Sequence, residues 1–325
     1  MKLKVTSFLF ISLLILSSCN NLPEKQVILS QPVSTYFDNL SSASGIGINE
    51  HTIYIVGDDT PWLFQLDNNL TIINKTQISS LDTLVKGRTP KHLKSDFEGA
   101  EVIKYDNKIE LVVISSGSSK ITRDTAYIID LIDNRVIFSK NLRALYENIK
   151  LEAKLPSTNE INIEGIAFSN EHAYLMHRGN VSTNIIIKIN RDNFLNYIKN
   201  SDVIPDFDIY KYKLPKYNGV QSGFSGVCLN PDNSGLIFTA SMEDTKDEIN
   251  DGSILGSYVG IIPFSEMSNG EYTASLLLDN NKLLEKKLEG ISVNYVTESG
   301  ELQVVAVCDN DNGTSDIITF RLIIK

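Results

Sequence analysis

The sequence predicts an all-β fold, a single β-propeller of five four-stranded blades. Short runs rich in Val, Ile, Tyr and Phe alternate with clusters of Asn, Asp, Gly and Ser, which is typical of strands joined by turns. Helical periodicity is scarce, and only 141–149 and 191–199 are expected to form helices. A short motif also recurs five times, at intervals that suit propeller blades.

The repeated motif is an acidic or hydroxyl residue, then glycine, then an apolar residue that opens a strand. The five glycines are separated by 54, 66, 61 and 64 residues. The triplets are Ser44-Gly45-Ile46, Glu98-Gly99-Ala100, Glu164-Gly165-Ile166, Ser225-Gly226-Val227 and Glu289-Gly290-Ile291. Each triplet is followed by a turn, a second apolar strand that ends in a polar tip, and a third strand. Five occurrences at the same place in a strand pattern predict one blade each.

The last repeat leaves little chain for an outer strand. Val27-Ile28-Leu29-Ser30, which precedes the first blade, is expected to supply that strand and close the ring. Six blades are the alternative, because the longer intervals leave spare length and one blade could have lost its triplet. We expect the propeller domain to span 27–325.

The N-terminal segment has the pattern of a lipoprotein signal peptide. Two lysines precede an apolar stretch that is too short to span a bilayer, and small residues then lead to a cysteine. Leu16-Ser17-Ser18-Cys19 resembles the lipobox of bacterial lipoproteins, whose cysteine carries acyl chains such as palmitate. We therefore expect a signal peptide over 1–18, a lipidated Cys19 with a polar tether over 19–26, and attachment to a membrane through that lipid. An ordinary signal peptide with an incidental cysteine is the alternative.

The residues after the lipobox predict the membrane. Asn20 and Asn21 stand where an aspartate commonly retains lipoproteins in the inner membrane. The expected location is thus the bacterial cell envelope, at the outer membrane.

Composition excludes several classes of partner. The formal net charge is −10, and it becomes −12 when the two lysines of the signal peptide are removed. An acidic surface argues against nucleic acid as a partner. A monomer that binds a small molecule or an envelope component is expected. Cys228 and Cys308 lie in apolar strand contexts and are expected to be buried free thiols, with a disulfide as the alternative.

The polar segments of the repeat are expected to converge on one face. In an antiparallel hairpin the start of the first strand and the end of the second lie at the same end. The triplets occupy the first position and the polar tips the second, and the first strand of a blade is the innermost. The ligand-binding candidates are Asp58, Asp59, Glu98, Ser118, Arg123, Glu164, His177, Arg178, Glu243, Asp244, Glu289, Asp309 and Asp311.

Carboxylates gathered around one mouth repel one another, so some must be paired with arginine, protonated or bound to a cation. Oxygen-only clusters suit Ca²⁺ or Mg²⁺. Glu98, Glu164 and Glu289 are therefore candidate metal ligands, and Ca²⁺ is the cofactor such a site would accept. Alternatively, these glutamates are latches that accept hydrogen bonds from the backbone of the neighbouring blade. The basic loop 86–94 is expected to be solvated.

Two motifs that carry known chemistry are rejected. The segment 309–313 has the alternating Asp and Asn of a calcium loop, but its twelfth position is Phe320 where an EF-hand requires glutamate. Ser225 lacks the second glycine of a nucleophile elbow and opens a strand, not a helix. The residues thus indicate no nucleophile and base for catalysis.

The motifs together resemble a family of uncharacterised bacterial lipoproteins that are predicted propellers, found mainly in Bacteroidetes. The residues that carry the resemblance are Asp96-Phe97-Glu98-Gly99, Ser116-Gly117-Ser118-Ser119 and the Glu-Gly-Ile triplets. More distantly, the chain is similar to phytase-like esterase and SdiA-regulated propellers. The resemblance covers nearly all of 40–325 and implies the fold more than the chemistry. In calcium-dependent β-propeller phytases, carboxylates on one face hold calcium ions, but such sites also use lysines and arginines, in which this face is expected to be poor.

Two functions therefore stay open. The first is a binding or scaffold propeller that holds a ligand or divalent cation at its acidic mouth. The second is a metal-assisted hydrolase of phosphate or carboxylic esters.

Overall fold

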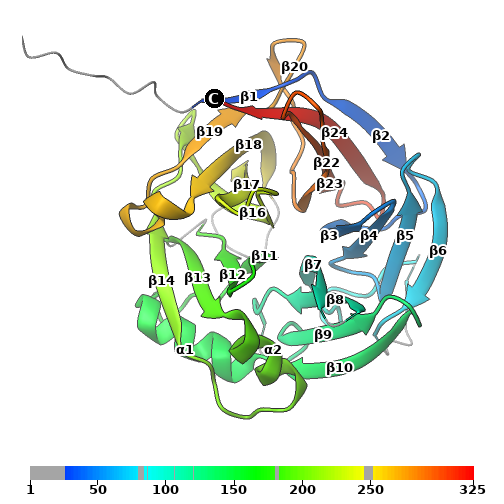
Figure 1. Ribbon diagram of the computed structural model, residues 1–325, viewed down its shortest axis with the longest axis vertical. Helices are drawn as coiled ribbons and strands as arrows, with labels where there is room; N and C mark the ends of the chain where they lie inside the picture. Colours follow the sequence, from blue (N-terminus) through cyan, green and yellow to red (C-terminus); the bar gives the residue numbers. More distant parts are fainter. Residues whose placement is uncertain are drawn as a thin grey trace, which may run out of the picture.

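The computed structural model describes residues 26–79, 84–85, 87–105, 107–119, 121–179, 183–244 and 252–325. These residues form a ring of five antiparallel sheets around a central axis (Figure 1). The prediction of a five-bladed propeller is confirmed. Cys19 and the signal peptide lie outside the described residues.

Blades one to three each contain four strands in chain order. Blade one is β3 (Ala43–Asn49), β4 (Thr52–Gly57), β5 (Trp62–Asp67) and β6 (Ile72–Gln77). Blade two is β7 (Phe97–Tyr105), β8 (Lys108–Ser115), β9 (Thr125–Asp130) and β10 (Arg135–Asn141). Blade three is β11 (Ile163–Phe168), β12 (His172–His177), β13 (Asn184–Asn190) and β14 (Phe207–Tyr212).

Blade four adds a short strand at its inner edge. It is β15 (Lys216–Tyr217), β16 (Val220–Leu229), β17 (Gly235–Asp244), β18 (Ser253–Pro263) and β19 (Thr273–Leu276). A small hairpin of β20 (Leu278–Asp279) and β21 (Lys282–Leu283) then leads to blade five.

Blade five closes the ring with strands from both ends of the chain. It is β22 (Ile291–Val296), β23 (Leu302–Asp309) and β24 (Ser315–Ile324), with β1 (Val27–Leu29) and β2 (Val33–Phe37) on its outer edge. Val27 pairs with Ile324, as the predicted closure requires. The second N-terminal strand, β2, was not predicted, and it pairs with residues 315–319, the first half of β24.

The core lies between neighbouring blades because the inner strands are buried on both faces. Side chains alternate along β4. Ile53 and Ile55 pack toward blade five, while Tyr54 and Val56 pack toward blade two. This explains why the second strand of each repeat is a nearly continuous apolar run.

The triplet glycines bring the five inner strands close together. A Cβ on Gly226 would lie 1.9 Å from the Glu289 carbonyl oxygen, and one on Gly290 would lie 2.5 Å from that of Ser44. Gly45, Gly99 and Gly165 likewise face backbone of the next blade at 3.0–3.4 Å. Any side chain at these positions would push neighbouring blades apart, and this accounts for the recurrence of glycine.

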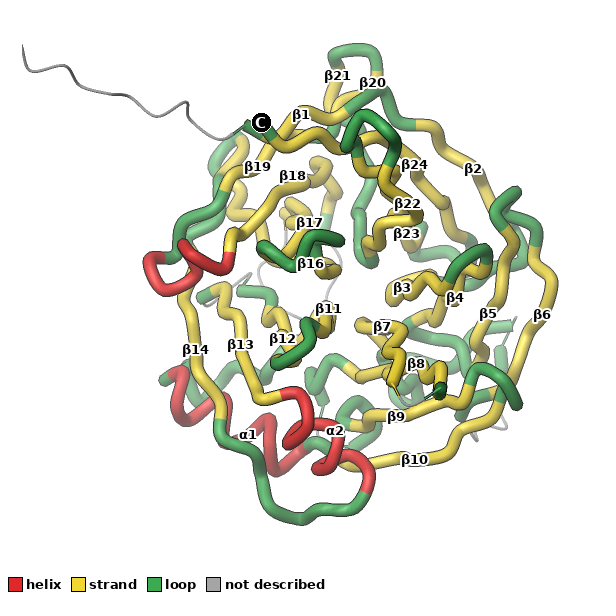
Figure 2. The backbone as a smooth tube through the Cα atoms, viewed as in Figure 1, coloured by secondary structure: helices red, strands yellow, loops and turns green. Residues whose placement is uncertain are grey.

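The helices are short and lie at the periphery of the ring (Figure 2). They are α1 (Arg143–Ala153), α2 (Arg191–Lys199) and the 3₁₀ helix η1 (Phe264–Asn269). Both α-helices were predicted, and α1 begins and ends a few residues later than expected. Among the described residues, no helix combines the length and hydropathy that a membrane span requires.

Candidate functional site

The triplets lie at one end of the axis, which we call the mouth face; the opposite end is the turn face. At four triplets the register of the inner hairpin shifts at the first residue, which is Ser44, Glu98, Glu164 or Ser225. A bulge re-aims the side chain that it contains. The position that varies between acid and hydroxyl is therefore turned away from regular strand packing.

Three blades meet at the Ser44 hydroxyl. Its oxygen lies 2.7 Å from Glu98 Oε2 of blade two and 2.8 Å from Glu289 Oε2 of blade five. Glu289 is also paired with Lys287, at 2.8 Å. Glu98 and Glu289 therefore link neighbouring blades through a hydroxyl, and not through the backbone N–H groups that the predicted latch required.

This geometry favours a proton on one of the two carboxyl groups. A serine hydroxyl has one hydrogen to donate, yet two carboxyl groups lie within hydrogen-bonding distance of it. Burial, followed by the charges of Glu164, Asp96 and Glu289, raises the pKa of Glu98 well above its ordinary value. We infer that protonated Glu98 donates to Ser44, and that Ser44 donates to Glu289.

Lys94 lies between two further carboxylates of the mouth. Its Nζ is 2.7 Å from Asp96 Oδ1 and forms a second ion pair with Asp58 Oδ2. Only 13% of the Lys94 side chain is exposed. The expectation that loop 86–94 is solvated is therefore wrong for Lys94, because the buried Asp96 and the partly buried Asp58 hold it.

The same loop neutralises another acid. Arg88 Nε pairs with Asp59 Oδ2, and Arg88 Nη1 donates to the Asp311 carbonyl at 3.0 Å. With Lys94 and Lys287, these contacts correct the expectation that this face is poor in lysine and arginine. The sequence alone does not show that a lysine or arginine in a loop has a buried acidic partner elsewhere in the fold.

Asp96 is the best-satisfied carboxylate of the mouth. Ser116 and Ser118 donate to its Oδ2, the latter at 2.8 Å, and Arg123 Nη1 lies 3.2 Å from the same atom. Burial opposes its ionisation, but Lys94 and Arg123 hold the pKa of Asp96 below its ordinary value. The predicted residues Ser118 and Arg123 are thus at the site, where they act on Asp96.

Arg178 organises the other side of the mouth. It lies 3.6 Å from Glu164 and 3.0 Å from Glu243, and only 2% of its side chain is exposed. Asn162 Nδ2 donates to Glu164 at 2.5 Å. Burial raises the pKa of Glu164, although Arg178 and Lys287 oppose that shift.

His177 is fully buried beside this ion-pair network. The backbone N–H of Asn162 donates to its Nδ1 at 2.9 Å. Burial lowers the pKa of His177 to about 4. Its imidazole is therefore neutral at physiological pH and is bound to the blade that contains it.

Three carboxylates form a cluster that could hold a metal ion. Asp58, Asp96 and Glu98 each offer an oxygen, and the three atoms lie within 4.8 Å of one another. Asp58 Oδ1 is buried and receives no hydrogen bond from the described residues. Of the three glutamates expected to bind metal, Glu98 belongs to this cluster, while Glu164 and Glu289 are engaged with Arg178 and Lys287.

The other polar residues at the triplets and tips differ in their contacts and exposure. Ser225 Oγ bonds to Thr239 Oγ1 at 3.2 Å, within its own blade. Asp309 is buried and accepts a hydrogen bond from the backbone of Asp311, which is itself exposed. Asp244 is exposed at the end of β17.

Sequence reasoning missed Asp96, Asn162 and Lys287, although a signal existed. All three stand two residues before the first residue of a triplet, and all three contact mouth carboxylates or bases. Aligning the triplets would have shown this second polar position. Lys94 and Arg88 had no such signal, because they lie in a loop between repeats.

The channel below the mouth is nearly closed. The triplet residues enclose a cavity of about 10 Å³, room for about one water molecule. Further along β7, burial raises the pKa of Glu101 to about 8. Its charge also acts on the Cys228 thiol of blade four. The space between the triplets therefore has no room for a ligand larger than about one water molecule.

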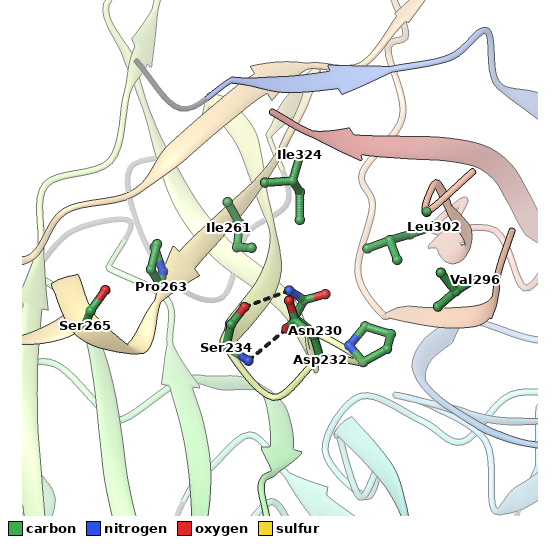
Figure 3. Close-up of a pocket in the computed structure, with 11 residues that line it drawn as sticks. Asn230, Asp232, Ser234, Ile261, Pro263, Ser265, Val296, Leu302 and Ile324 are labelled. Carbon is green, nitrogen blue, oxygen red and sulfur yellow. Dashed lines mark hydrogen bonds between the residues drawn. The ribbon is translucent and has the colours of Figure 1, made fainter. Parts of the chain in front are cut away.

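A second cavity, of about 460 Å³, lies on the turn face between blades four and five (Figure 3). Its walls include Ile261, Leu302 and Ile324. Its polar groups satisfy one another, since Asn230 donates to Ser234 Oγ and the Ser234 backbone donates to Asp232.

Cys228 and Cys308, as expected, are buried free thiols.

The comparisons with known proteins identify a family but no activity. Residues 39–322 match the model of a family of unknown function, DUF6929. The chain belongs to this family. No curated protein matches it. Family membership thus agrees with the expected resemblance to an uncharacterised group and assigns no chemistry.

Solved structures similar to the chain are remote from it. Myxococcus xanthus glutaminyl cyclase is 11% identical, with a TM-score of 0.43 over 93% of this chain and 98% of that one. The tail fiber of Staphylococcus aureus phage P68 is 12% identical, with a TM-score of 0.45 over 92% and 52%. The extracellular domain of a putative one-component system from B. thetaiotaomicron is 10% identical, with a TM-score of 0.35 over 88% and 39%. Likenesses of this size say nothing about what this family member binds.

Proposed function

We propose that the protein is a binding propeller of the cell envelope, and that its mouth takes up a divalent cation between Asp58, Asp96 and Glu98. One observation carries the proposal: this carboxylate cluster contains a buried oxygen, Asp58 Oδ1, that no described residue satisfies. Buried carboxylate oxygens without a donor are costly to maintain, and a cation would offset that cost.

The donor set fits a hard cation. All three groups are carboxylates, and the nearby Ser118 adds a hydroxyl. Ca²⁺ and Mg²⁺ prefer such oxygen ligands. Ca²⁺ tolerates irregular geometry better than Mg²⁺, so it is the ion we expect to bind more tightly.

Lys94 is the resident competitor for that ion. Its ammonium neutralises Asp58 and Asp96 and occupies part of the space between them. Burial, followed by the charges of Asp59 and Asp96, raises the pKa of Asp58 to about 7 even with Lys94 beside it. One ammonium is therefore insufficient for this group of acids, and a divalent ion would either displace Lys94 or bind on the Oδ1 side of Asp58.

The test is thermal unfolding with Ca²⁺, with Mg²⁺ and with EDTA. A ligand that binds only the folded state stabilises it and so raises the melting temperature. At a ligand concentration one hundred times Kd, the free energy of unfolding increases by about 2.7 kcal/mol. Glu98→Gln cannot ionise to become an anionic ligand of the cation but keeps a hydrogen-bond donor toward Ser44, so this variant should fold and lose the response. Asp244→Asn, an exposed acid at the same face, is the matched control and should keep it. An identical melting temperature in Ca²⁺ and EDTA would exclude the cation.

A hydrolase is less well supported. His177, the histidine expected at the mouth, is bonded to backbone and has a lowered pKa. The lysines and arginines near the cluster are already paired with carboxylates. The binding function is the one that these contacts favour.

The envelope location rests on the sequence. The lipobox-like Leu16-Ser17-Ser18-Cys19 supports lipid on Cys19, and Asn20-Asn21 supports the outer membrane. The test is fractionation of cells that express the protein or Cys19→Ser. The wild type should sediment with outer membranes, while Cys19→Ser should be released by osmotic shock. Equal release of both would overturn the anchor.

A further inference from the structure

The register of the closing strands fixes where the tether joins the propeller. β24 begins at Ser315, on the mouth face, and ends at Ile324, on the turn face. Because β1 is antiparallel to β24, Val27 pairs with Ile324 and Gln26 exchanges backbone hydrogen bonds with Lys325. The chain that precedes Gln26 therefore enters at the turn-face end of blade five.

We propose that the turn face of blade five lies against the lipid bilayer and that the carboxylate mouth points away from it. The orientation rests on the proposed lipid at Cys19. Six residues lie between Cys19 and Gln26, and the seven steps from one Cα to the next span at most about 25 Å. β24 has ten residues, so its mouth end lies about 30 Å from its turn end. A tether that starts at the turn end is too short to let the mouth face rest on the membrane.

The turn-face end of blade five also has a surface suited to a bilayer. Tyr295 and Val296, at the end of β22, are 54% and 49% exposed, and Ile324 beside the tether is 37% exposed. Val296 and Ile324 also line the cavity between blades four and five (Figure 3). Exposed apolar groups beside a tyrosine are typical of protein surfaces at the lipid headgroup region.

The rim of the ring is the competing surface. Val33 and Tyr36 of β2 are each 61% exposed there. They lie farther from Gln26 along β24, and their neighbour Ser34 bonds to Asp316. A propeller lying on this rim would bring the mouth and turn ends of blade five equally close to lipid.

The experiment compares two positions at opposite ends of blade five. Ser299→Cys lies in the β22–β23 turn and Asn312→Cys in the tip after β23, and both residues are exposed. Each variant of the full-length lipidated protein is labelled with an environment-sensitive fluorophore and reconstituted into phosphatidylethanolamine–phosphatidylglycerol vesicles. Some of the lipid carries a quencher in its headgroup. Unsubstituted protein gives the labelling background, because Cys228 and Cys308 are buried.

We expect strong loss of fluorescence at Ser299→Cys and little at Asn312→Cys. Equal quenching at both would show that the rim lies on lipid, and stronger quenching at Asn312→Cys would reverse the orientation; either result overturns the proposal. Absence of quenching at both positions, in protein that still floats with the vesicles, would overturn it too. Flotation of wild type and Cys19→Ser is measured in parallel, so failure of the anchor is seen separately: in that case the wild type itself does not float.

Discussion

Replacing Lys94 with methionine removes a buried charge and keeps a side chain of similar length. Asp58 and Asp96 would then lose their shared counter-ion in a place where only 13% of the Lys94 side chain reaches solvent. Removing one partner of a buried ion pair typically costs about 3–5 kcal/mol. Protonation of Asp58, whose pKa is already raised to about 7, relieves part of that cost, so we expect about 3 kcal/mol.

The assay is chemical denaturation at neutral pH without divalent ions. Lys104→Met is the matched control, because Lys104 is an exposed lysine on β7 of the same blade. Lys94→Met should unfold at clearly lower denaturant with an unchanged slope, and Lys104→Met should match the wild type. Equal stability of the two variants would refute the buried ion pair. Added Ca²⁺ should restore more stability to Lys94→Met than to the wild type, because the variant lacks the competing ammonium.

Three further predictions concern the ring and its channel. Gly226→Ala should lower the melting temperature more than Gly165→Ala. The added Cβ would lie 1.9 Å from a carbonyl oxygen at Gly226, whereas its nearest neighbour at Gly165 would be 3.0 Å away. Equal melting temperatures would contradict these glycine contacts. A chain that begins at Pro32 lacks β1, and its free energy of unfolding should be lower by about 2 kcal/mol or more than that of a chain that begins at Gln26, because Val27 is buried where the ring closes. Unchanged stability would mean that β2 alone closes the ring. The pKa of Glu101 is about 8 when folded, above its ordinary value of 4.5, so its contribution to stability is present below about pH 4.5 and is lost as pH rises through 8. Glu101→Gln should therefore match the wild type near pH 5 and exceed it near pH 9 in denaturant titrations, and parallel curves would contradict this.

The fold was predictable because each repeat has a recognisable local pattern of residues. Glycine recurs where the inner strands touch, and apolar runs recur where strands are buried on both faces. Even the closing strand could be identified, since the last repeat lacked its outer strand and Val27–Leu29 stood unpaired before the first. β2 was missed because its two adjacent polar residues, Ser34 and Thr35, break the apolar pattern of a short strand at an exposed edge.

The site was predictable in place but not in its pairings. Glu98, Glu164 and Glu289 lie at one face because each stands at the start of an inner strand, as the hairpin geometry requires, and Glu98 and Glu164 also lie at bulges. Which cation neutralises which acid depends on loops between repeats. Lys94 is distant from Asp58 in sequence, and no periodic pattern connects them.

Diffraction from crystals soaked in Ca²⁺ or Mn²⁺ tests the cation site most directly, because Mn²⁺ can be located by its anomalous scattering. The account predicts an ion bordered by Asp58, Asp96 and Glu98, with the Lys94 amino group displaced or shifted from its contacts with both aspartates. Crystals that show Lys94 in place and no ion at this cluster, at millimolar metal and neutral pH, would contradict it.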